Sequence, residues 1–139
     1  MLLYGWIFVS LNIFAYNLML MALEREVKVF LNELKQFLNI WPIVFLHRPK
    51  NSLQHLADIG ITANRRLEII VSLETEDYSE GPLNETQQNG TDMWVFGKTV
   101  KKTEIYIKLT VNKKTNNIIC ISFHIAEAPI NYPLKSNIK

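Results

Sequence analysis

The strongest constraint on the fold comes from two segments near the C-terminus in which apolar and polar side chains alternate. In residues 104–111 every second side chain is aliphatic: Ile105, Ile107, Leu109 and Val111. In residues 118–125 one face would carry Ile119, Ile121, Phe123 and Ile125, and the other Ile118, Cys120, Ser122 and His124. A period of two is typical of β-strands with one buried face. We therefore predict two strands here, and a third over residues 93–98.

The pairing of these strands decides which polar side chains become neighbours. Turns at residues 101–103 and 112–117 make an antiparallel meander the simplest arrangement. Because the side-chain period is two, both apolar faces are buried together when Val111 lies opposite Ile119. That register makes two polar cross-strand pairs: Tyr106 with His124, and Lys108 with Ser122. A phenol, an ammonium, a hydroxyl and an imidazole are thus expected together on one sheet face.

Helices are predicted ahead of these strands. Residues 22–38 place apolar side chains three or four positions apart, which is the spacing of an amphipathic helix. Ser52 is positioned to cap a short helix that Gly60 ends. Thr62 is positioned to cap a second helix that continues to Leu73.

The remaining segments complete an α+β fold class. Residues 74–92 are polar and rich in turn-forming residues, so we predict a loop. The short apolar run at residues 43–46 can add an N-terminal strand. We expect a small antiparallel sheet, made of the three C-terminal strands plus this fourth one, packed against the N-terminal helices. Trp94 and Phe96 are expected to pack within the protein.

A run without charge precedes this domain. Residues 1–23 contain no charged side chain, and 19 of them are apolar. The run can cross a bilayer as a helix, and the basic residues Arg25 and Lys28 after it would then place the domain in the cytoplasm. A cleavable signal is disfavoured because no basic residue precedes the run. The other explanation is that translation begins at Met19 or Met21.

These alternatives lead to the same domain organisation. We divide the chain into a hydrophobic leader, residues 1–21, and a domain, residues 22–139. Both explanations predict a cytoplasmic domain. A membrane is a partner only where the leader is translated and retained.

Charge is distributed unevenly along the domain. Residues 74–92 hold six acidic side chains and no basic one, whereas residues 93–117 hold six lysines and a single acid, Glu104. Basic side chains on strands and hairpin turns suit the phosphate backbone of a nucleic acid. We predict that Lys98, Lys101 and Lys102 bind RNA. The alternative is that these lysines are the ordinary solvated residues of edge strands and turns.

Motifs for cofactors and metals are absent from the sequence. There is no Walker loop, no GxGxxG and no HExxH, the three histidines are far apart, and Cys120 is the single cysteine. No cofactor or metal site is therefore expected. Metal-free RNA cleavage does fit the polar sheet face, because the 2′-hydroxyl can attack the neighbouring phosphorus with help from side chains alone. His124 would transfer a proton, Lys108 would stabilise the phosphoryl charge, and Tyr106 would orient the hydroxyl or stack on a base. Ser122 is predicted to contact RNA.

Five segments carry a resemblance to a known family: LADIGITANRR, EDYSEGP, MWVFGKTV, EIYIKLTV and ICISFHIAE. In this order and spacing they resemble the MqsR family of type II toxin–antitoxin toxins. The resemblance implies a fold similar to that of the RelE-type toxins, mRNA cleavage without a metal, and a cognate antitoxin partner. Tyr106 matches the family's sheet tyrosine.

Three positions depart from the family pattern. His124 stands where better-known members have a lysine, Val95 stands where they have a glutamine, and Glu80 falls near a position where they have a lysine. His124 keeps a group capable of proton transfer. The loss of the glutamine implies that Lys98 or Lys108 takes its place.

These observations predict a toxin that is an mRNA endoribonuclease, with mRNA, free or on the ribosome, as substrate and an antitoxin as partner. The alternative is a non-catalytic protein-interaction module, or a membrane-tethered partner protein.

Overall fold

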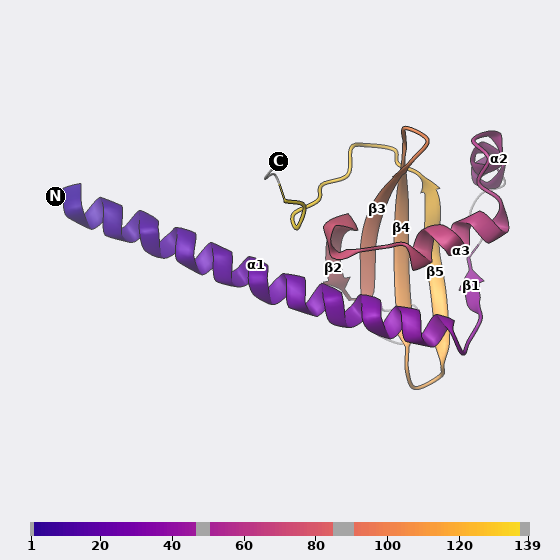
Figure 1. The fold of residues 1–139 in the computed structure, drawn as a ribbon, viewed down its shortest axis with the longest axis horizontal. Helices are drawn as coiled ribbons and strands as arrows, with labels where there is room; N and C mark the ends of the chain where they lie inside the picture. Colours follow the sequence, from indigo (N-terminus) through magenta and orange to yellow (C-terminus); the bar gives the residue numbers. More distant parts are fainter. Residues whose placement is uncertain (1, 47–50, 85–90, 137–139) are drawn as a thin grey trace.

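The computed structural model describes residues 2–46, 51–84 and 91–136, and it confirms the α+β fold class. Three helices precede most of the sheet: α1 (Leu2–Leu38), α2 (Asn51–Asp58) and α3 (Ala63–Val71). A 3-10 turn, η1 (Thr75–Asp77), leads into the later strands. The strands are β1 (Ile43–Phe45), β2 (Tyr78–Leu83), β3 (Met93–Val100), β4 (Thr103–Asn112) and β5 (Asn117–Ile125). They form one sheet in the order β1-β5-β4-β3-β2 (Figure 1).

The helix α1 runs without a break through the expected boundary between leader and domain. Its C-terminal half packs on the sheet: Val27, Phe30, Leu31 and Leu34 are buried, and the Phe30 ring stacks on the rings of Trp94 and Phe96. Its N-terminal half extends away from the sheet, and residues 4–19 are all exposed (Figure 1). By length and composition this helix could cross a membrane.

The predicted meander is confirmed, with a correction to its register. Tyr106 lies opposite His124 and Lys108 lies opposite Ser122, as expected. The ladder then shifts, and Ile121 is the extra residue of a β-bulge. Val111 therefore faces Ile118, so its predicted pairing with Ile119 is wrong.

The bulge also changes which side chains of β5 face the core. Ile118 and Cys120, which were expected on the polar face, are 0% and 1% exposed in the core. Beyond the bulge Phe123 is buried, while Ser122 and His124 remain partly exposed on the other face. The extra residue thus buries apolar side chains on both sides of the bulge while the polar pairs with β4 remain in place.

Two further strand predictions need correction. The polar segment 74–92 was predicted to be a loop, but its first part forms η1 and the edge strand β2, which pairs antiparallel with β3. Its residues 85–90 lie outside the described part of the structure. The strand predicted at residues 43–46 is present as β1, but it pairs parallel to β5, so the sheet is mixed.

The short helices illustrate how capping residues set boundaries. Thr62 caps α3 as predicted, because its side chain accepts a hydrogen bond from the Arg65 backbone N–H (3.2 Å). Ser52 does not have the predicted capping position, since α2 already begins at Asn51.

Trp94 and Phe96 lie in the core beneath α1, as expected.

Candidate functional site

The face of the sheet opposite α1 carries the predicted polar pairs. Tyr106 and His124 come from neighbouring strands, and their rings stack with centroids 5.0 Å apart and an angle of 15° between planes. The ammonium of Lys108 lies 5.9 Å from the centre of the Tyr106 ring. Ser122 is the cross-strand partner of Lys108. Alternation along β4 and β5 therefore brings all four side chains onto one face.

The hydrogen bond made by His124 determines which ring nitrogen is free. Nδ1 of His124 lies 2.8 Å from the backbone oxygen of Ile125. A carbonyl oxygen can only accept a hydrogen bond, so Nδ1 carries the proton in the neutral ring. This leaves the lone pair on Nε2, which makes Nε2 the proton acceptor.

These four residues line one cleft of about 440 Å³. Its walls come from three places: the face of β4 and β5, Ser79 at the start of β2, and residues 126–131 after the last strand. The cleft has the size of a typical small-ligand site. Ser79 and residues 126–131 also line the cleft, and this was not predicted from the sequence because both segments have a turn-like composition.

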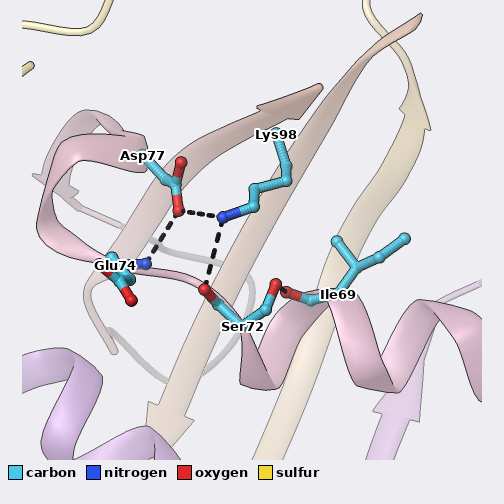
Figure 2. Close-up of polar contacts among 5 residues, drawn as sticks. All are labelled: Ile69, Ser72, Glu74, Asp77 and Lys98. Carbon is cyan, nitrogen blue, oxygen red and sulfur yellow. Dashed lines mark hydrogen bonds and ion pairs between the residues drawn. The ribbon is translucent and has the colours of Figure 1, made fainter. Parts of the chain in front are cut away.

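Lys98 lies on the other face of the sheet. Its ammonium forms an ion pair with Asp77 (2.9 Å) and donates a hydrogen bond to the backbone oxygen of Ser72 (3.4 Å) (Figure 2). The same Asp77 oxygen accepts from the Glu74 backbone N–H (2.9 Å). Lys98 thus ties η1 and the end of α3 to β3, and the structure does not bring it together with Tyr106 and His124.

The other two lysines predicted to bind RNA form the turn between β3 and β4. Lys101 and Lys102 have φ angles of 49° and 65° and exposed side chains. Two consecutive residues with positive φ are typical of the tight type I′ turn of a hairpin. The turn lies at the end of β4 nearer to Tyr106. Both side chains are exposed, and the Lys101 ammonium lies next to Gly60 in the turn between α2 and α3.

The position of Val95 shows which lysine can replace the family's glutamine. Val95 is 1% exposed and is the cross-strand partner of Lys108. Lys98 points to the opposite face, so Lys108 is the cation placed beside this position.

Glu127 also lines the cleft, whereas neither the cysteine nor a metal-binding cluster adds to the site among the described residues. Burial raises the pKa of the Cys120 thiol to about 12, so the thiol stays protonated at neutral pH. Over the described residues, no group of three or more His, Cys, Asp or Glu side chains could hold a metal ion.

The fold and the site together define a small α+β protein that presents a polar, lysine-bearing cleft on one face of a mixed sheet. Within that class, the chain belongs to the MqsR toxin family: the family described as "Motility quorum-sensing regulator, toxin of MqsA" matches residues 28–125. The match runs from within α1 to the last residue of β5. Membership makes the chain a toxin of a toxin–antitoxin system, with an antitoxin as its partner. A comparison with curated proteins found no match.

Proposed function

We propose that the domain is an endoribonuclease that cleaves mRNA without a metal ion, and that this activity is the toxic one. The observation that carries the proposal is the shared cleft of Tyr106, Lys108, Ser122 and His124. An imidazole with a free nitrogen beside an ammonium supplies both proton transfer and charge stabilisation. The family supports the same assignment, since it is a family of toxins.

The proposed reaction is a transfer within the RNA chain. The 2′-oxygen attacks the adjacent phosphorus, a new O2′–P bond forms, and the P–O5′ bond breaks. Nε2 of His124 accepts the 2′-hydroxyl proton, and water in the open cleft supplies a proton to the leaving 5′-oxygen. The Lys108 ammonium stabilises the charge on the phosphoryl oxygens, and the Ser122 hydroxyl can donate to one of them. Tyr106 orients the ribose or a base.

The basic turn would extend the binding surface away from the cleft. Lys101 and Lys102 are exposed at the hairpin between β3 and β4 and can contact backbone phosphates beyond the reacting one. Lys98 is not part of this proposed surface, because its charge is paired with Asp77 on the opposite face.

The activity can be tested with purified protein and a single-stranded RNA. We expect cleavage in the presence of EDTA, with a 2′,3′-cyclic phosphate on one product and a 5′-hydroxyl on the other. An excess of the antitoxin should suppress cleavage. Intact RNA together with tight antitoxin binding would instead support the non-catalytic interaction module. Cleavage that EDTA abolishes would contradict the metal-independent mechanism.

We further propose that the domain works in the cytoplasm. The exposed residues 4–19 are the feature that needs explanation, because a continuous apolar surface of this size is unusual in a soluble monomer. If this part of α1 spans a bilayer, Arg25 and Lys28, which follow the uncharged run, would lie on the cytoplasmic side. A start at Met19 or Met21 would remove the exposed surface and leave the domain in the same compartment.

The location can be tested by mass spectrometry of the native N-terminus combined with membrane fractionation. A chain that begins at Met1 should sediment with membranes, and its domain should be digested by protease only in inside-out vesicles. A chain that begins at Met19 or Met21 should remain in the soluble fraction. Digestion of the domain from outside intact spheroplasts would contradict the proposed location.

A further inference from the structure

A segment beyond the family match lies against the face that carries the cleft. The match ends at Ile125, and the chain continues over the sheet as residues 126–132. One residue of β4 holds this segment: Glu104. Its backbone oxygen accepts from the Ala126 N–H (2.8 Å), Oε1 accepts from the Ile130 N–H (2.9 Å), and Oε2 accepts from the Tyr132 hydroxyl (2.7 Å). Both carboxylate oxygens are therefore used to fix the segment.

Gly97 allows the segment to pack directly on the backbone of β3. A Cβ atom at this position would meet the Tyr132 hydroxyl, and it would come within 2.9 Å of Ile130 Cδ1. Gly97 is also the cross-strand partner of Tyr106. The segment thus contacts the sheet immediately beside a residue of the cleft.

The Tyr132 contact persists over the working pH range. Burial, together with the hydrogen bond that the hydroxyl donates to Glu104, raises the pKa of Tyr132 above its usual value. The phenol therefore remains a donor at and well above neutral pH.

The segment supplies more than half of the residues that line the cleft, and its composition differs from that of the sheet face. Residues 126–132 contain no basic side chain and one acid, Glu127. A segment without cations is a poor partner for phosphate, whereas Lys108 on the sheet face of the cleft is a good one. The segment offers apolar surface from Pro129 and Ile130 and an amide from Asn131, which are groups that contact bases and sugars.

We propose that residues 126–132, held by Glu104, form the base-selecting wall of the cleft. This inference rests on the proposed ribonuclease activity and deepens it. The RNA backbone would pass along Lys108 and His124, and the base beside the scissile phosphate would point toward Pro129 and Asn131. The segment acts as a positioning element, and Asn131 determines which base edge is accepted.

Three substitutions in the full-length protein test this role. Glu104→Ala removes both side-chain bonds to the segment, Tyr132→Phe removes one of them and keeps the ring, and Asn131→Ala leaves the segment held but removes the amide. The matched control is Glu33→Ala, which removes a carboxylate that pairs with Lys113 outside the cleft. Each protein cleaves a pool of RNAs that differ at the nucleotides flanking the cut, and sequencing gives the rate ratio between preferred and disfavoured sites.

For Glu104→Ala and Asn131→Ala we expect this ratio to fall about tenfold, with a smaller fall for Tyr132→Phe and none for Glu33→Ala. Hydrogen exchange at the Ile130 amide should become faster in Glu104→Ala, since its acceptor is gone. Suppose that exchange at Ile130 becomes faster in Glu104→Ala while the ratio of cleavage rates is unchanged in all three variants. That result would overturn the base-selecting role, but it would not contradict the ribonuclease activity. A wild-type protein that cleaves no RNA would overturn both.

Discussion

Replacing His124 with alanine should lower the rate of RNA cleavage by about 100- to 10,000-fold, because positioned proton transfer contributes about that much to catalysis. The substitution removes the Nε2 lone pair of a residue that lines the cleft, and it leaves Lys108 and Tyr106 on the neighbouring strand. RNA should still bind to the variant. In cells, induction of the wild-type protein should arrest growth, and induction of His124→Ala should not.

The matched control is His55→Ala, which removes an exposed imidazole from α2, outside the cleft. It should cleave RNA at the wild-type rate. Tyr106→Ala should also relieve growth arrest, since it removes the ring that stacks on His124. Full toxicity in both cleft variants, with normal protein levels, would contradict the assignment of the site.

The pH profile of the same reaction separates proton transfer from phosphate binding. Only a neutral imidazole ring can accept a proton. The wild-type rate should therefore fall as the pH is lowered and His124 becomes protonated. A flat profile would leave His124 with a structural or phosphate-binding role.

The sequence predicted the strands that carry the site because their burial pattern is simple. Residues 104–111 have one aliphatic and one polar face, so only one orientation of β4 buries the aliphatic one. The run Ile118-Ile119-Cys120-Ile121 is apolar on both faces of the strand. Its side-chain pattern therefore does not distinguish between the two possible registers with β4. The position of the bulge in β5 therefore depends on packing against the core, which a local pattern does not contain.

Two elements were missed because edge and irregular segments lack a repeating pattern. β2 pairs with one neighbour only, and polar residues are common in strands at a sheet edge. Residues 126–132 are held by one glutamate side chain distant in sequence, Glu104. Neither arrangement produces a periodicity that could be recognised beforehand.

The alternation of side chains along a strand could have shown which of the predicted lysines face the cleft and which face the core. Lys98 has the same parity as Trp94 and Phe96, which were expected in the core, and the structure places it on their face. Lys108 has the parity of Tyr106 and faces the cleft. Because side chains alternate between the two faces of a strand, a lysine contributes to a surface only when its position places it on that face.

Replacing Lys98 with methionine should lower the free energy of unfolding by about 1–3 kcal/mol, because the Asp77 carboxylate would lose its charged partner in a largely buried position. The side chain of Asp77 is 13% exposed and that of Lys98 is 28% exposed. Methionine keeps an unbranched stem of similar length, so the change isolates the lost charge and its hydrogen bonds. Urea unfolding of the full chain in mild detergent measures the difference.

The matched control is Lys113→Met, which breaks the ion pair with Glu33. That pair is shorter, at 2.6 Å, but the lysine side chain is 62% exposed, and exposed pairs contribute less than about 1 kcal/mol. The double variant Lys98→Met/Asp77→Asn should recover part of the lost stability, since no uncompensated charge remains. RNA affinity and its salt dependence should be the same in Lys98→Met as in the wild type. A loss of RNA affinity with unchanged stability would restore Lys98 to the RNA-binding surface and contradict its structural role.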